Sequence, residues 1–202
     1  MDPRAERTIE ALLQAAEKLF SNRAVADVTL EEIAGTAGVA VGSVYNHFGS
    51  KAGLHAALVE RALDTDRHFM DLAYVEGRSP VDQLYAAAEE YLAFYLANPD
   101  YFRMLAFPHD PGSYPAGRDL ALRLAESVNE QNSRMVAALR LGIKAGVIRD
   151  VDAEDVATVL WAAWNGIISL GWRSDGLHRD DDELSRLLRV ATDAVAHGLL
   201  LE

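Results

Sequence analysis

Residues 29–51, TLEEIAGTAGVAVGSVYNHFGSK, constrain the fold of this chain more than any other segment does. The first half carries an apolar stripe at helical spacing, made of Leu30, Ile33, Ala34 and Ala37. The second half carries another stripe, made of Val41, Val44 and Phe48. Thr29 precedes the first stripe as an N-cap, and Gly38 permits a sharp turn between the two stripes. The segment therefore predicts two short helices joined by a tight turn.

The wider stretch of residues 7–63 resembles the DNA-binding end of the TetR family of one-component transcriptional repressors. Most of the likeness lies in GVAVGSVYNHFGSK, whose ending Tyr45-x-x-Phe48-Gly49-Ser50-Lys51 separates this family from other helix-turn-helix proteins. The resemblance implies a three-helix, helix-turn-helix DNA-binding domain over residues 1–49. It also implies a helical-bundle domain for ligand binding and dimerisation over residues 50–202.

The resemblance assigns DNA contacts to nine positions: Thr29, Ala40, Val41, Gly42, Ser43, Tyr45, Asn46, His47 and Lys51. Thr29, Tyr45 and Lys51 correspond to phosphate anchors of the family. Gly42 and Ser43 stand where the family's second motif helix meets base edges; the serine can donate or accept, and the glycine allows close backbone approach. The alternative interpretation is that Tyr45 and its neighbours are ordinary core or surface side chains.

Two departures from the family pattern accompany this assignment. Val41 stands at a position that is frequently polar or basic in relatives, and here Ala40 and Val41 can offer only apolar contact, for example to thymine methyl groups. Ala40 also lacks the side-chain oxygen of a good N-cap, which is worth about 0.5–2 kcal/mol. Ala24 stands where relatives carry a glycine, so the loop after the first helix is expected to take a different path.

The charge of the chain is unusual for a DNA-binding protein. The net charge is −12, and residues 1–51 contribute only −2 of it, with five basic and seven acidic side chains. Since phosphate binding normally relies on a basic surface, we expect binding to depend on helix N-termini, hydroxyl groups, a few basic side chains and the avidity of a dimer.

The remaining sequence predicts an all-α protein of about nine helices, because its apolar residues repeat every three or four positions. The first helix is expected from about Arg7, and the eighth from Asp152 to about Arg173. The chain has no cysteine, no apolar run long enough to span a bilayer, and no signal peptide at its charged start. We therefore expect a cytoplasmic protein.

The last two helices are the expected dimer interface. The eighth is apolar around most of its circumference, which is typical of a helix that lies between a core and a second subunit. In the TetR family these helices pair with their twofold mates, and two DNA-binding domains must meet successive major grooves about 34 Å apart. The alternative is that both helices only close a monomeric core.

Aromatic residues in the second domain suggest a site for a small apolar or aromatic effector. The candidates are Phe69, Tyr74, Tyr91, Tyr95, Phe102, Phe107, Trp161, Trp164 and Asn165. Aromatic side chains at helical spacing are also what a core contains, and this interpretation stays open for each of them. Asn165 differs, because a buried amide must find hydrogen bonds from a ligand, a neighbour or a partner subunit.

The function expected from these observations is that of a ligand-responsive repressor that binds palindromic double-stranded operator DNA as a homodimer. No nucleophile elbow, phosphate loop or metal-ligand spacing points to an enzyme, a metal or a cofactor. His55 with Glu60, and Asp66 with His68, could meet on a helix face, but such pairs are usually solvated. The alternatives are an activator and an interaction protein that kept the fold without DNA binding.

Overall fold

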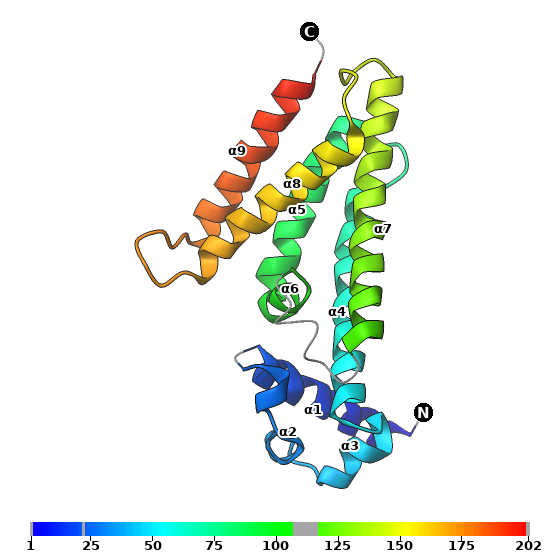
Figure 1. Cartoon of the computed structure of the whole chain (residues 1–202), viewed down its shortest axis with the longest axis vertical. Coiled ribbons are helices and arrows are strands. Elements are labelled where there is room, and N and C mark those ends of the chain that lie inside the picture. Colours follow the sequence, from blue (N-terminus) through cyan, green and yellow to red (C-terminus); the bar gives the residue numbers. More distant parts are fainter. Residues whose placement is uncertain (1, 22, 107–116, 201–202) are drawn as a thin grey trace. The chain divides into compact units, whose positions relative to one another are not determined.

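The structure, a computed structural model, describes residues 2–21, 23–106 and 117–200, which form two compact units. The predicted all-α fold is confirmed over these residues, which form nine α-helices and no strand (Figure 1). A single antiparallel bridge joins Ile148 and Leu200. The first unit comprises the described residues of Met1–Asp64 and Asn98–Ala125, and the second those of Thr65–Ala97 and Glu126–Glu202.

Helices of the first unit are α1 (Pro3–Phe20), α2 (Leu30–Ala37), α3 (Val41–Phe48) and α6 (Pro99–Ala106), together with the beginnings of α4 (Lys51–Ala73) and α7 (Gly117–Lys144). Helix α1 packs against α2, α3 and α6. Its buried face consists of Leu12, Leu13, Ala15, Ala16 and Phe20. Full burial of each large apolar side chain contributes about 1.5–3 kcal/mol, so this face holds the three-helix domain together.

Helix α1 begins at Pro3, four residues before the predicted start at Arg7. The cause is local, because the Asp2 carboxylate accepts a hydrogen bond of 2.9 Å from the backbone N–H of Arg4. Pro3 at the first helical position adds a backbone already set for a helix.

The turn between α2 and α3 has the predicted chemistry. Thr29 caps α2 in a capping box with Glu32, and Gly38 ends α2 in the left-handed region with φ of +69°. The N–H of Val39 then donates to the carbonyl oxygen of Ala34 at 3.0 Å, which closes the turn. Ser50 likewise caps α4, its hydroxyl accepting from the N–H of Gly53 at 3.0 Å.

The second unit contains the ends of α4 and α7 with α5 (Pro80–Ala97), α8 (Ala153–Ile168) and α9 (Asp181–Leu199). Helices α8 and α9 lie side by side, and both pack on α5 (Figure 1). Trp164 of α8 is fully buried, and its indole N–H donates to the Thr192 hydroxyl of α9 at 3.1 Å. Asp152, where the eighth helix is predicted to begin, caps α8, and Asp180 caps α9.

The eighth helix is predicted to run to about Arg173, and helical winding does continue to Trp172, but not as α-helix throughout. Regular α-helix ends at Ile168, and a 3-10 helix continues from Ser169 to Trp172. Gly171 in this 3-10 helix lies close to α5 and α9, since a Cβ atom added there would come within 2.5 Å of the Tyr95 hydroxyl oxygen and 3.0 Å of a Leu184 methyl carbon.

Candidate nucleic-acid interface

Helix α3 separates its side chains into an anchoring face and an exposed face. Val44 is fully buried against the rest of the first unit. Tyr45, Asn46 and His47 are exposed, and 57% of the Tyr45 surface is accessible. Of the other predicted contacts on or beside this helix, Ala40 and Gly42 are exposed, and Val41 and Ser43 are partly exposed. The structure therefore gathers seven of the nine predicted positions along α3.

The N-terminus of α3 lacks the side-chain cap that α2 and α4 have. Ala40 occupies the N-cap position in extended conformation, and no described side chain accepts from the first turn. Backbone N–H groups at a helix N-terminus carry partial positive charge and favour an anion such as a phosphate. The first turn of α3 thus offers donors at the end where Gly42 and Ser43 lie.

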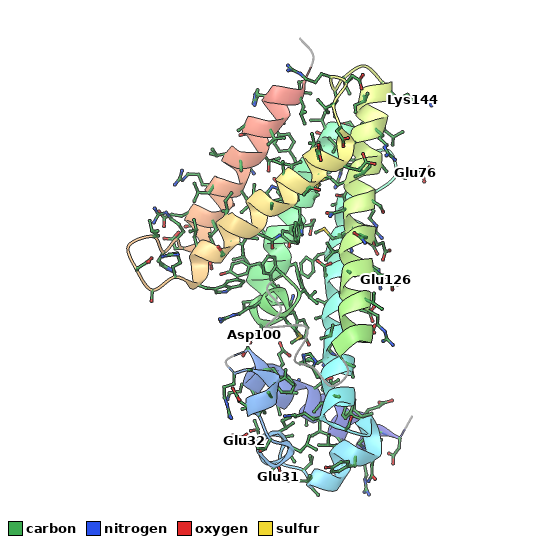
Figure 2. The ribbon with its side chains drawn as sticks, in the orientation of Figure 1. Glu31, Glu32, Glu76, Asp100, Glu126 and Lys144 are labelled. Atoms are coloured by element: carbon green, nitrogen blue, oxygen red, sulfur yellow. The ribbon has the colours of Figure 1, made fainter. Side chains whose placement is uncertain are left out.

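Thr29 lies in the capping box, and its hydroxyl is engaged there. The hydroxyl donates to a Glu32 carboxylate oxygen at 3.1 Å and accepts from the Glu32 backbone N–H, also at 3.1 Å. Arg23 binds the other Glu32 oxygen at 2.7 Å. The Arg23 hydrogen bond, with those from Thr29, lowers the pKa of the Glu32 carboxyl to about 2. Glu32 thus keeps its negative charge in the first turn of α2, where Glu31 also lies (Figure 2).

Lys51 donates hydrogen bonds to backbone carbonyl groups of the protein itself, which the sequence did not predict. Its ammonium group donates to the carbonyl oxygens of Val25 and Val28, each at 2.8 Å, and to that of Ala26 at 3.3 Å. An ammonium group has three donors, so these carbonyls use all of them. Lys51 therefore ties the start of α4 to the 3-10 helix Val25–Asp27, which precedes α2.

Several basic side chains of the first unit are paired within it. Arg23 pairs with Glu32, Arg61 with Glu10, and Arg123 with Glu60. The Arg7 guanidinium donates to the carbonyl oxygen of Pro3 at 3.1 Å. These basic groups are therefore engaged within the protein. On the exposed face of α3, which is polar and aromatic, the candidate DNA contacts are hydroxyl, amide, imidazole and backbone groups.

The candidate effector residues are divided between the two units. Phe69, Tyr74, Tyr91, Tyr95, Trp161, Trp164 and Asn165 belong to the second unit. Phe102 is buried in α6 of the first unit, and Phe107 lies outside the described residues. Asn165 finds its hydrogen bonds within the chain: the Tyr91 hydroxyl donates to its Oδ1 at 3.0 Å, and its Nδ2 donates to the Trp161 carbonyl at 2.9 Å.

Two side chains that were expected at a solvated surface are buried. His55 is 4% exposed and stacks edge-on against Phe20, with ring centroids 5.4 Å apart. Asp66 is 8% exposed on α4. Both positions lie next to apolar residues that repeat along α4, and this repeat indicates burial. The solvated surface was expected because both side chains are polar.

The comparison with known families decides the class of this protein. Residues 12–58 match the bacterial regulatory proteins of the tetR family, and residues 84–195 match the tetracyclin repressor-like C-terminal domain. The chain belongs to the TetR family. It is therefore a helix-turn-helix transcriptional regulator with a DNA-binding domain at its N-terminal end.

Curated TetR-family relatives show the same pattern along most of the chain. The repressor KstR2 of Mycobacterium tuberculosis is 30% identical over 153 residues, which are 71% of this chain and 70% of KstR2. The regulator UidR of Escherichia coli is 27% identical over 172 residues, covering 78% and 88%. TtgR of Pseudomonas putida is 39% identical over 80 residues, so the match spans 40% of this chain and 37% of TtgR.

Solved structures show the TetR fold over nearly the whole chain. PfmR of Thermus thermophilus has a TM-score of 0.76 at 22% identity, covering 92% of this chain and 97% of PfmR. The complex of SmeT with triclosan has a TM-score of 0.75 at 23% identity, covering 96% and 92%. SmeT is the repressor of a multidrug efflux pump of Stenotrophomonas maltophilia.

Two features are absent from the described residues. No group of three or more histidine or carboxylate side chains there could hold a metal ion. No described helix combines the length and apolar character that a bilayer crossing requires.

Proposed function

We propose that this TetR-family regulator is a repressor that binds a palindromic operator as a homodimer and is released by a small apolar or aromatic effector. The observation that carries the proposal is the division of α3, in which buried Val44 anchors the helix and Tyr45, Asn46 and His47 stay exposed. A helix held this way can enter a major groove without rearranging the three-helix domain.

Tyr45 is the proposed phosphate contact with the strongest support, because its side chain is the most accessible large one on α3. Thr29 and Lys51 are proposed to act mainly by positioning α2 and α4, since their polar groups are engaged within the protein. Base contacts are proposed for Gly42, Ser43, Asn46 and His47, with apolar contact from Ala40 and Val41.

The homodimer is proposed to form through α8 and α9. Both helices expose small and apolar residues outside their buried faces: Val159, Ala162 and Gly166 on α8, and Val190, Ala194 and Gly198 on α9. Added Cβ atoms at Gly166 and Gly198 would meet no atom within 4 Å, so these positions leave room for a second helix. A closed twofold dimer places two α3 helices on one operator.

The effector is proposed to bind among the helices of the second unit. Two observations support this location: the aromatic pairs Tyr91–Trp164 and Phe69–Phe94 lie in its interior, and the similar repressor SmeT forms a complex with the aromatic molecule triclosan. Helix α4 begins in the first unit and ends in the second, so a displacement of α4 by the ligand would reach the DNA-binding domain.

The test is a gel-shift titration with DNA that flanks the protein's own gene. Tyr45→Ala is expected to weaken binding by about 1–3 kcal/mol per dimer, because each half-site loses a hydrogen bond worth about 0.5–1.5 kcal/mol. Tyr45→Phe removes only the hydroxyl, so it isolates the contribution of this hydrogen bond to operator affinity. Leu177→Ala changes an exposed residue in the loop before α9 and is the matched control.

Helical content should be unchanged in all three variants, because Tyr45 and Leu177 each expose more than half of their surface. Equal operator affinity of Tyr45→Ala and the unaltered protein would contradict the proposed interface. Binding of the unaltered protein no tighter than to competitor DNA would favour an interaction protein that kept the fold.

A further inference from the structure

Four helices of the second unit contribute polar side chains to its interior, among them Asp66 of α4, Tyr91 of α5, Gln131 of α7 and Asn165 of α8. We call these four residues the polar cluster. Tyr91 and Asn165 satisfy each other through their 3.0 Å hydrogen bond. Asp66 and Gln131 differ, because each has unused hydrogen-bonding capacity.

Asp66 is 8% exposed and makes no hydrogen bond or ion pair with another described residue. Its neighbouring guanidinium groups are committed elsewhere: Arg67 lies 3.7 Å from Glu130, and Arg134 lies 2.7 Å from Asp71. The carboxylates of Asp66, Asp71 and Glu130 thus share the two guanidinium groups of Arg67 and Arg134. One negative charge is left without a partner when Asp66 is ionised. Burial raises the pKa of the Asp66 carboxyl to about 7.

Gln131 has both side-chain amide atoms buried, and neither has a hydrogen-bond partner within the described part of the chain. The residue lies on the inward stripe of α7, which includes Ser127, Met135, Ala138 and Leu139. A buried amide without partners costs about 1–3 kcal/mol, so such a group is normally satisfied by something.

The ion pairs between α4 and α7 place Asp66 and Gln131 at nearly the same level. Arg67 pairs with Glu130, and Asp71 with Arg134, so the two helices run in parallel with an offset of 63 residues. At this offset Gln131 is level with position 68, two residues beyond Asp66. Two residues of α-helix correspond to roughly 3 Å along the axis.

A molecule that satisfies this cluster must offer a donor to Asp66 and a second polar contact to Gln131. Its remaining surface would meet aromatic side chains, since Tyr91 stacks near Trp164 at a centroid distance of 6.0 Å. A protonated amine on an aromatic frame has this chemistry, because it supplies both the missing positive charge and several N–H donors.

We propose that the effector of this regulator is an aromatic or apolar molecule with one protonated amine, bound by Asp66 and Gln131. The inference rests on the proposed ligand-responsive function and narrows the chemical class of the effector. Tyr91 and Asn165 position the aromatic frame, and the Asp66 carboxylate supplies the charge that distinguishes an amine from a neutral ring.

The test compares three probes with the same ring: 2-naphthylmethylamine, 2-naphthylmethanol and 2-naphthoic acid. Their binding to the full chain is measured without DNA, by tryptophan fluorescence and calorimetry. We expect the amine to bind at least about tenfold tighter than the alcohol, and Asp66→Asn to remove that difference, because the variant keeps the shape and loses the charge. Gln131→Leu should weaken the amine several-fold.

Asp64→Asn is the matched control, since Asp64 is an exposed carboxylate on the same helix, and it should leave all three affinities unchanged. The proposal is overturned if the alcohol or the acid binds the unaltered protein as tightly as the amine does. It is also overturned if Asp66→Asn keeps the preference for the amine, or if the amine does not bind at millimolar concentration.

Release of operator DNA is measured separately with the same amine. Binding that depends on Asp66 but leaves DNA bound would support the site and contradict the proposed release of a repressor. Release of DNA by the alcohol and the amine alike would support the repressor and overturn the amine preference. The failures of the two proposals are therefore distinguishable.

Discussion

Single residues in this protein show that a polar side chain can be buried with opposite consequences. Burial lowers the pKa of His55 in the first unit to about 4 and raises that of Asp66 in the second to about 7. In both cases the neutral form is favoured, because the interior solvates charge poorly. The folded state therefore loses stability from His55 as the pH falls, and from Asp66 as the pH rises.

The Asp66 effect predicts a pH-dependent gain in stability for Asp66→Asn. The folded pKa of about 7 exceeds the ordinary value of 3.8, so the folded state binds more protons between these values. Its stability then falls as the pH rises through this window, and asparagine removes the loss. The Tm gain of Asp66→Asn over the unaltered protein should be larger at pH 7.5 than at pH 5. Equal Tm gains at both pH values would contradict the raised pKa of Asp66 in the folded state.

Lys51 allows a test that separates a structural role from a DNA contact. Lys51→Met removes hydrogen bonds to three carbonyl groups and should destabilise the protein by about 1–3 kcal/mol in urea denaturation. It should also weaken operator binding while leaving the slope of log affinity against log salt unchanged. A slope reduced by about 1 would instead indicate that Lys51 neutralises a phosphate.

At the scale of the helices, the sequence predicted what depends on neighbouring residues. Thr29, Asp152 and the turn at Gly38 act within a few positions, so their residue types suffice to place them. The change from α-helix to 3-10 helix after Ile168 was not predicted.

The candidate sites, like the helices, could be predicted only where they depend on residues close in the sequence. The exposed face of α3 follows from its own period and from the family resemblance. The partner of Asn165 is Tyr91, 74 residues away, and the polar groups around Asp66 come from four helices. No local pattern joins such residues, so Asp66 and Gln131 were not among the predicted site residues.

The uncapped start of α3 gives a prediction for this helix alone. Ala40→Ser should stabilise the first unit by about 0.5–2 kcal/mol, because a serine hydroxyl can accept from the first-turn N–H groups that Ala40 leaves without a side-chain acceptor. Urea denaturation measures the change. A loss of stability, or none, would show that the first turn is already satisfied in another way.

At the scale of the whole molecule, the proposed repression would require two copies of the chain to act together. Arg23, Arg61 and Arg123 of the first unit are paired within it and the chain carries a net charge of −12, so one copy should bind DNA weakly. Two copies joined through α8 and α9 would add their binding energies at a fixed spacing, because the second contact becomes intramolecular.

Val159→Arg tests this interface, since Val159 is 56% exposed on the proposed face of α8. The variant should sediment as a monomer, keep its helical content, and lose most operator affinity, because two buried arginines would face each other across the twofold axis. Val147→Arg, at an exposed valine just after α7, should remain dimeric. A dimeric Val159→Arg would place the interface elsewhere.

The most direct test of the central claim is a footprinting titration of the unaltered protein on DNA flanking its own gene, at two salt concentrations and with competitor DNA. The account predicts salt-sensitive protection of a palindrome, with two protected half-sites about one helical turn apart. Protection of a single half-site by a monomer, or no protection beyond that of competitor DNA, would contradict it.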